Sequence, residues 1–334
     1  MKRLQLLENW IAQQFPEKSF TLQPASADAS FRRYYRVTLG DETLIAMDAP
    51  PPHEDCAPFV QVAQLLAGTA HVPVVQASDM KRGFLLLSDL GDLTYLQALT
   101  DRPENAKALY ADATRALIDM QLIMPLDGMP VYDENLLRYE LNLFPEWYVA
   151  RHLQIDLTAN QKTVLEQTFG RILQNNLSQP RVFVHRDYHS RNLMVTTPNP
   201  GILDFQDAVL GPITYDLVSL LKDAYICWDE THILDWAIRY WEGARRAGLS
   251  VSSDFGNFYR DFEWMGVQRH IKVLGIFARL AYRDGKQSYL NDMPLVMTYL
   301  RKACERYQEL RPFLKLLDEL DNNESSDERV GYTF

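Results

Sequence analysis

One stretch of the chain brings two aspartates and an asparagine into a short, ordered pattern. Asp187 ends the sequence His-Arg-Asp, Asn192 comes five residues later, and Asp204 opens the sequence Asp-Phe-Gln. Carboxylate and amide oxygens are the ligands that a phosphate-bound magnesium ion prefers, and a nearby carboxylate can accept the proton of an attacking hydroxyl. The pattern therefore indicates phosphoryl transfer to a hydroxyl, with Asp187 as the base and Asn192 and Asp204 as metal ligands.

Short strands are expected to position these three side chains. Apolar runs over 182–184, 193–195 and 202–203 are bounded by Asn, Pro and Gly residues, which predicts β-strands joined as a hairpin. Asp187 and Asn192 would then lie on a loop between strands. Either residue alone would be typical of a surface loop, but the joint spacing between apolar runs favours a site.

Composition and charge exclude several classes of protein. The 334 residues are 47% hydrophobic and 23% charged, which allows a large core and two lobes. A net charge of −10 argues against binding to nucleic acid or to an anionic membrane surface. The cysteines form no CxxC pair, and neither a signal peptide nor an apolar run of about 20 residues is present. We therefore expect a cytoplasmic monomer.

The spacing of apolar residues divides the chain into a strand-rich part and a helical part. The first part is predicted to contain helices over 1–15 and 56–66 and strands over 20–24, 35–39, 43–47 and 83–88. The second part is predicted to contain helices over 96–124, 135–149 with a break at Pro145, 159–174 and 215–224, and several more over 231–317. The predicted fold class is therefore α+β.

The division predicts a nucleotide-binding lobe over 1–90 and a catalytic and acceptor-binding lobe over 91–317. A polar tail, frayed in structure, is predicted over 318–334 because its residues show no apolar periodicity.

The polar pattern also resembles a known catalytic loop. The H-R-D-x-x-x-x-N spacing is similar to that of kinases, and Gly211-Pro212 and Tyr215-Asp216-Leu217 follow at the start of an apolar helix. With these motifs the chain resembles the aminoglycoside phosphotransferase and choline kinase-like superfamily over residues 30–283. The resemblance implies a bilobal protein-kinase-like fold in which Asp216 braces the catalytic loop. Helix capping is the alternative explanation for an aspartate at that position.

Longer motifs narrow the resemblance. The sequences A-S-F-R-R-Y-Y-R-V over 29–37, L-L-L-S-D-L-G-D over 85–92 and R-H-I-K-V-L-G-I-F-A-R-L over 269–280 are similar to those of bacterial cell-wall amino-sugar kinases. This likeness implies transfer from ATP, with Mg²⁺, to the anomeric hydroxyl of N-acetylmuramate or N-acetylglucosamine. Two alternatives stay open: another small-molecule or protein hydroxyl as acceptor, and an inactive kinase that serves as a binding module.

The nucleotide site departs from the kinase pattern at one position. Most kinases of this shape carry a lysine in the third strand, but residues 44–48 contain none, and Met47 stands at the expected place. Arg32 and Arg33 are the nearest candidates to replace it, since a guanidinium matches phosphate oxygens; solvated surface arginines are the alternative. The other predicted nucleotide contacts are Ser30 and Phe31 in a small-residue turn, and the backbone of Ser88, Asp89 and Leu90 as a hinge.

The acceptor site should combine hydrogen-bonding side chains with an apolar surface. The candidates lie on two predicted helices and beside the metal ligands: Glu140, Asp207, Trp264, Arg269 and His270. Glu140 and Asp207 would accept hydrogen bonds from sugar hydroxyls, and a cation near Arg269 would meet a sugar carboxylate. Core packing is the alternative for Trp147 and Tyr148, which follow Glu140 in the same predicted helix, because an aromatic stripe at helical spacing is also typical of a buried face.

Overall fold

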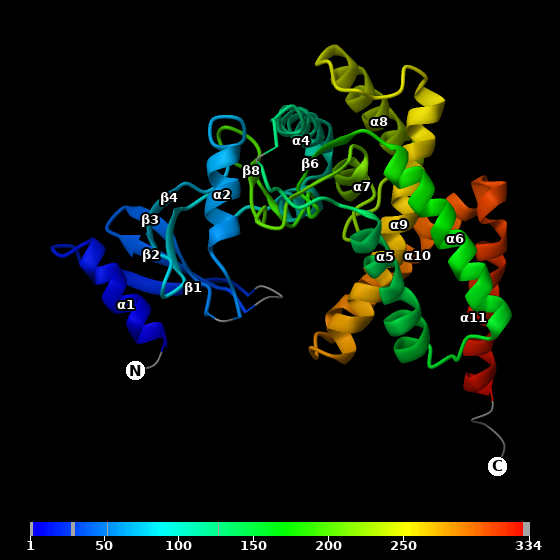
Figure 1. Ribbon diagram of the computed structural model, residues 1–334. Coiled ribbons are helices and arrows are strands. Elements are labelled where there is room, and N and C mark those ends of the chain that lie inside the picture. Colours follow the sequence, from blue (N-terminus) through cyan, green and yellow to red (C-terminus); the bar gives the residue numbers. More distant parts are fainter. Residues whose placement is uncertain (1–2, 28–30, 52, 126, 330–334) are drawn as a thin grey trace. The chain divides into compact units, whose positions relative to one another are not determined.

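The computed structural model describes residues 3–27, 31–51, 53–125 and 127–329 of the chain. The chain forms two units, each built from two segments (Figure 1). The first unit comprises residues 1–123 and 191–208, and the second comprises 124–190 and 209–334. The first unit thus extends beyond the predicted boundary at residue 90. In the part of the chain that the structure describes, no helix is long and apolar enough to cross a membrane.

A five-stranded antiparallel sheet forms the centre of the first unit, in the order β1-β2-β3-β5-β4. Its strands are β1 (Thr21–Ala27), β2 (Arg33–Leu39), β3 (Glu42–Asp48), β4 (Val75–Asp79) and β5 (Phe84–Ser88). The predicted strands are confirmed. β4 was not predicted, because its sequence V-Q-A-S-D has a single β-branched residue and ordinary polar content.

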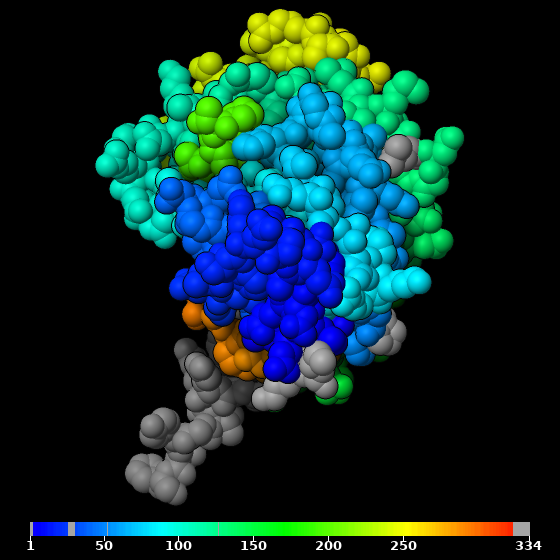
Figure 2. All heavy atoms as spheres, turned by 90° about the vertical axis from the view of Figure 1, so that its left-hand side faces the viewer, coloured from blue at the N-terminus to red at the C-terminus, as the bar shows by residue number. Residues whose placement is uncertain are grey.

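The two faces of this sheet have different surroundings. Helix α1 (Arg3–Gln14) lies on the surface of the unit (Figure 2). It packs on one face of the sheet, where its Trp10 belongs to the same buried cluster as Val37, Ala46 and Leu86. Because side chains alternate along a strand, Met47, which follows Ala46 in β3, points to the face of the sheet opposite α1. Met47 is buried, with 1% of its surface exposed.

The first unit also contains α2 (Ala57–Leu66), α3 (Tyr95–Asp101), α4 (Ala106–Gln121), β7 (Leu193–Met194) and β8 (Gly201–Ile202). The single helix predicted over 96–124 is wrong. A 3-10 turn begins at Pro103 and separates α3 from α4, because proline lacks the backbone N–H that a continuous helix needs. The start of α3 is capped by Thr94, whose side chain accepts a hydrogen bond from the backbone of Gln97.

The second unit is mainly helical and is organised around one long helix, α9 (Phe255–Tyr282) (Figure 1). The other elements are α5 (Glu134–Leu143), a π-helix (Phe144–His152), α6 (Ala159–Ser178), β6 (Arg181–Val184), β9 (Val209–Pro212), α7 (Tyr215–Leu221), α8 (Glu230–Arg246), α10 (Met293–Arg306) and α11 (Arg311–Arg329). Helices α5, α6, α7 and α10 all contact α9, which is why α9 buries polar as well as apolar positions. The predicted α+β fold is confirmed.

The close contact between α9 and the end of α5 depends on a glycine. A Cβ atom added to Gly275 would lie 2.4 Å from the carbonyl carbon of Leu143 and 2.6 Å from its oxygen. We expect Gly275→Ala to lower the free energy of unfolding by about 1–3 kcal/mol, since the backbone of α5 must move. Urea unfolding measures this, with Gly170→Ala on α6 as the control. Among the described residues, a Cβ added to Gly170 meets no atom within 4 Å apart from the adjoining backbone of its own helix. Equal urea midpoints for the two variants would contradict the prediction.

The predicted hairpin over 182–205 is confirmed for the runs that form β7 and β8, and it is wrong for the run that forms β6. β6 pairs with β9, whereas β7 pairs with β8. The runs are too short and uniformly apolar to show their partners in the sequence, and β9 contains Gly211 and Pro212, which hid it as a strand. The predicted positions of the three polar residues along the chain are confirmed. Asp187 and Asn192 lie between β6 and β7, and Asp204 lies just beyond β8.

The predicted frayed tail is also wrong as far as Arg329. Helix α11 runs to that residue, and its Leu316, Leu317 and Leu320 are buried. These leucines continue an apolar spacing that begins before residue 318, where the predicted tail was taken to start. Arg301 of α10 forms ion pairs with Asp318 and Asp321. Residues 330–334 lie outside the described part of the chain.

Candidate active site

In the second unit, the loop after β6 is held from below by a buried aspartate. Asp216, in the first turn of α7, accepts hydrogen bonds from the backbone N–H of His185 at 2.6 Å and of Arg186 at 2.9 Å. Burial raises the pKa of Asp216 to about 7, and the two backbone bonds act in the opposite direction. The bracing role that the resemblance implied for Asp216 is confirmed. Asp187 comes directly after Arg186, so these two hydrogen bonds fix the backbone that leads to it.

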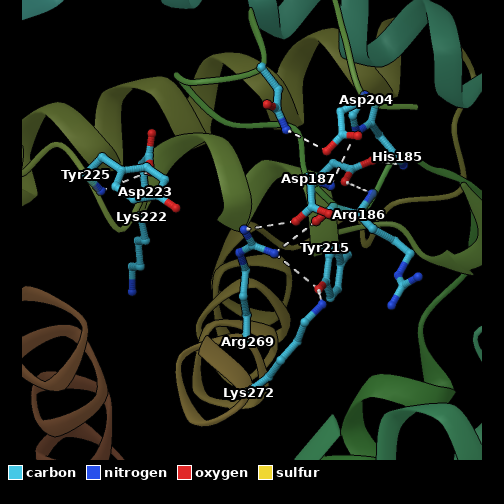
Figure 3. Close-up of polar contacts among 12 residues, drawn as sticks. His185, Arg186, Asp187, Asp204, Tyr215, Lys222, Asp223, Tyr225, Arg269 and Lys272 are labelled. Atoms are coloured by element: carbon cyan, nitrogen blue, oxygen red, sulfur yellow. Dashed lines mark hydrogen bonds and ion pairs between the residues drawn. The ribbon is translucent and has the colours of Figure 1, made fainter. Parts of the chain in front are cut away.

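Asp187 is half-exposed and lies beside cations of α9. Its side chain is 42% exposed, and the Nη2 atom of Arg269 lies 4.0 Å from its Oδ1 atom (Figure 3). Burial alone would raise the pKa of Asp187, but the charges of Lys272 and Arg269 outweigh burial and hold that pKa well below its usual range. Asp187 is therefore an anion at neutral pH, as a group that accepts a proton from a hydroxyl must be.

Removing the charge of Lys272 should move the pH dependence of turnover. We expect Lys272→Met to raise the pKa of Asp187, because one attractive charge is lost. Activity requires ionised Asp187, so the acid limb of kcat should move to higher pH. The charged and titratable groups with the largest effect on Asp187 include Lys272, Arg269, His189 and Arg186, and Asp187 in turn acts on Asp216.

A pH–rate profile measures the shift, with Lys302→Met on the exposed side of α10 as the control. Titration of Asp216 is common to both variants, so only the difference between them reports on Lys272. An acid limb at the same pH in both variants would contradict the prediction.

The structure corrects the prediction that Glu140 accepts hydrogen bonds from a sugar. Glu140 is 3% exposed. Its Oε1 atom pairs with Arg186 at 2.7 Å and Lys272 at 3.1 Å, and its Oε2 atom accepts from Tyr132 and from Gln268 at 3.2 Å. A carboxylate has about four acceptor positions, so these donors saturate it. Glu140 is thus part of the support behind the loop.

The predicted sugar contacts on α9 are likewise internal. Trp264 is 3% exposed and packs against Tyr307, while His270 is 2% exposed and stacks on Tyr299. Burial lowers the pKa of His270 to about 3, so its ring is uncharged.

Arg269 is 6% exposed and donates to the carbonyl oxygen of Arg186 at 3.0 Å and to the Tyr215 hydroxyl at 3.2 Å. Polar residues within an apolar helix indicated a ligand site, but here Arg269 bonds to the loop and to α7. Among the described residues, Nε1 of Trp264 and Nδ1 of His270 are buried without a hydrogen-bond partner. Asp207 is exposed, and its predicted role in sugar binding stays a prediction.

Sequence reasoning missed a second support of the same loop, at the end of α7. Asp223 is buried and accepts from the backbone N–H of Ser190 at 3.0 Å and from its hydroxyl at 2.5 Å. Next to it, the ring of Tyr225 lies edge-on to His189 and against Phe277 of α9. No motif marks these residues, and the only signal was an aspartate and a tyrosine directly after an apolar helix.

In the first unit, Asn192 and Asp204 lie together. The side-chain amide nitrogen of Asn192 lies 3.4 Å from Oδ2 of Asp204. The backbone carbonyl oxygen of Asn192 accepts a hydrogen bond from the backbone N–H of Leu203 at 2.9 Å. Asp204 has a φ of 63°, a left-handed conformation that aspartate adopts more readily than most residues. The next residue, Phe205, is buried against Phe59 of α2. The backbone of Asp204 is therefore fixed on both sides.

This pair fits a magnesium ion. Both side chains carry oxygen atoms that can coordinate a metal ion, and Mg²⁺ is usually held by one or two protein groups together with waters and phosphates. Gln206 donates to Oδ1 of Asp204 at 2.7 Å. In the part of the chain that the structure describes, the other amide atom of Gln206, Oε1, is buried without a hydrogen-bond partner. That acceptor would suit a water molecule bound to the metal.

The predicted phosphate-binding residues do not all lie on the same side of the sheet in the structure. Phe31 is exposed, and its backbone N–H donates to Glu54 at 3.1 Å. Arg32 also pairs with Glu54, at 3.6 Å. Arg33 pairs in register with Asp48, on the face that α1 covers, and so points away from the face of Met47. Ser30 lies outside the described residues.

The predicted hinge is tied to the sheet. The backbone N–H of Ser88 donates to Val74 at 2.9 Å, so this donor is engaged within the sheet. The carboxylate of Asp89 accepts two bonds from Arg36, at 2.6 and 3.1 Å. These contacts fix the segment that leads to Leu90, whose backbone stays a predicted partner for adenine.

Comparisons of the sequence with known proteins agree with the geometry. Residues 21–250 match the model of a family described as "Phosphotransferase enzyme family". A protein of Neisseria meningitidis serogroup B is 49% identical over 337 residues and 100% of both chains, and it is named N-acetylmuramate/N-acetylglucosamine kinase. A protein of Pseudomonas aeruginosa with the same name is 51% identical over 300 residues, 90% of this chain and 88% of its own.

Solved structures share the fold at low sequence identity. An aminoglycoside phosphotransferase bound to GDP and kanamycin aligns with a TM-score of 0.61 and 16% identity, over 90% of this chain and 98% of its own. An ADP-bound aminoglycoside phosphotransferase aligns with a TM-score of 0.56 and 13% identity, over 88% of this chain and 97% of its own. The fold implied by the sequence motifs is therefore confirmed.

Proposed function

We propose that this chain, which belongs to the phosphotransferase enzyme family, transfers the γ-phosphoryl group of ATP to the anomeric hydroxyl of N-acetylmuramate or N-acetylglucosamine. The observation that carries the reaction type is Asp187, an ionised and half-exposed carboxylate on a loop fixed by buried partners. The choice of sugar rests on the names of the full-length relatives.

Asp187 would act on the acceptor. Its carboxylate orients the sugar hydroxyl and takes the proton as the hydroxyl oxygen forms a bond to the γ-phosphorus, while the bond from that phosphorus to ADP breaks. Asn192 and Asp204 would hold Mg²⁺, which neutralises charge on the phosphates when bound. We assign nucleotide binding to residues 1–90 and the acceptor to residues 91–317.

An anomeric hydroxyl suits this base. A hemiacetal hydroxyl is more acidic than an ordinary alcohol, and the low pKa of Asp187 makes it a weak base that benefits from an acidic partner. The rings of His189 and Tyr225, two and 38 residues beyond the base, would supply the apolar surface that a sugar ring needs. Asp207 would accept a hydrogen bond from a sugar hydroxyl.

Arg32 is our candidate for the missing strand lysine. Arg32 comes directly before β2, and the alternation of that strand, if continued by one residue, would place its side chain on the face of Met47. The Arg32 side chain is 12% exposed and lies beside Glu54. We expect Arg32→Ala to raise the KM for ATP by about tenfold, the effect of losing one charge-assisted hydrogen bond. Arg33→Ala is the matched control, because it removes the same charge from the other face of the sheet. Steady-state kinetics with varied ATP test both, and equal KM values would return Arg32 to a structural role.

A panel of acceptors tests the proposed function. Purified protein with ATP and Mg²⁺ should release ADP with N-acetylmuramate or N-acetylglucosamine, and the release should stop when Mg²⁺ is chelated. Choline, homoserine and an aminoglycoside serve as alternative acceptors. Turnover with one of these and none with either amino sugar would replace the proposed acceptor. Nucleotide binding without turnover on any acceptor would instead support a binding module.

A further inference from the structure

Arg186, which precedes the base, is held through three separate polar groups. Its backbone N–H donates to Asp216 of α7 at 2.9 Å, and its carbonyl oxygen accepts from Arg269 of α9 at 3.0 Å. Its Nη2 atom donates to Glu140 of α5 at 2.7 Å. Three helices that are distant in sequence thus contact Arg186, the residue whose backbone sets the position of Asp187.

The backbone of Arg186 explains why such support is needed. Its φ is 78°, a left-handed conformation that a residue with a side chain adopts at a cost of about 1 kcal/mol or more. A strained conformation persists only where surrounding contacts hold it. The guanidinium also lies over the ring of Tyr132, 5.6 Å from its centre, and the Tyr132 hydroxyl itself donates to Glu140.

The ion pair between Arg186 and Glu140 is largely shielded from water. The Arg186 side chain is 22% exposed and that of Glu140 is 3% exposed. Attraction to the surrounding cations lowers the pKa of Glu140, even though burial acts to raise it. A buried, ionised pair of this kind costs desolvation, and its best-attested use is to fix one conformation.

We propose that Arg186 and Glu140 are positioning residues for Asp187, an ion pair between the catalytic loop and α5 that keeps the loop in its left-handed turn. The pair does not touch the acceptor or the nucleotide in this account. It fixes the point from which the carboxylate of Asp187 projects, and with it the distance to the hydroxyl that is deprotonated. This inference rests on the proposed phosphoryl transfer.

Arg186→Gly separates the two contributions. Glycine adopts the left-handed backbone without strain, so the variant keeps the turn accessible and loses the Arg186 side chain with its guanidinium. We expect kcat to fall by about 10²-fold, the effect of a misplaced base, with the KM for ATP and for the sugar nearly unchanged. Guanidinium ion at millimolar concentration should restore part of kcat, and Arg186→Lys should lie between the wild type and Arg186→Gly. Arg260→Ala, which removes an arginine–glutamate pair elsewhere on α9, is the control.

Glu140→Asp serves as the second variant if Arg186→Gly does not fold, since it shortens the partner and keeps its charge. It should also lower kcat more than KM. Wild-type kcat in a folded Arg186→Gly protein, or a loss confined to KM, overturns the inference and leaves the proposed function standing. A wild-type protein that phosphorylates neither amino sugar overturns the proposed function, and the inference falls with it.

Discussion

Asp187→Asn is expected to lower kcat by about 10²- to 10⁴-fold, the usual contribution of a general base. The amide cannot accept the proton, and it also loses the attraction to Arg269. The KM for ATP should change little, because this account gives Asp187 no contact with the nucleotide. Steady-state kinetics with the sugar and ATP varied in turn measure both effects.

Asp156→Asn is the matched control, since it removes an exposed carboxylate from the same unit. It should turn over like the wild type. Thermal unfolding of Asp187→Asn should show that the variant is folded. The Asp187 side chain is 42% exposed, and asparagine has nearly the same size, so no cavity forms. A folded Asp187→Asn protein with wild-type kcat would remove Asp187 from the mechanism.

Asp204→Asn is expected to reduce kcat/KM by about 10²- to 10³-fold at a fixed, low concentration of Mg²⁺. The amide keeps the size of the side chain and loses the negative charge that favours a divalent cation. Activity should recover in part as Mg²⁺ is raised, so the concentration of Mg²⁺ that gives half-maximal activity should increase.

A titration of activity with Mg²⁺ measures this shift. Asp101→Asn is the control, because Asp101 is an exposed carboxylate of the same unit that accepts from the Gln97 side chain. If Asp204→Asn and Asp101→Asn need the same concentration of Mg²⁺ and have the same kcat/KM, Asp204 is not a metal ligand.

Local patterns in the sequence were enough to predict most of the helices and strands and the polar motif. Alternating apolar residues predicted β2 and β3, and helical spacing predicted α1, α6 and the helices from α8 onward. The pairing of β6 with β9 was not predictable in this way, because it joins residues 181–184 to 209–212 across a segment that folds with the other unit. Pairing at that separation is decided by the tertiary structure.

The candidate acceptor site was the least predictable part. Glu140, Arg269 and His270 have residue types that suit a ligand site and a buried network equally well. What distinguishes the two is burial and the identity of the partners, and Glu140 and Lys272 are 132 residues apart in sequence. Arg186 carried no signal at all, because its left-handed backbone is imposed by contacts and not by its own preference.

The phosphorus-31 NMR spectrum of the product is the most direct test of the central claim, phosphoryl transfer to an anomeric hydroxyl. The reaction of ATP with N-acetylglucosamine should give a new phosphate signal that couples to the single anomeric proton, and so appears as a doublet when protons are not decoupled. The Asp187→Asn protein, under the same conditions, should give almost none. A triplet, from coupling to the two methylene protons of a 6-phosphate, would contradict this claim, and so would inorganic phosphate as the only new signal besides those of ADP.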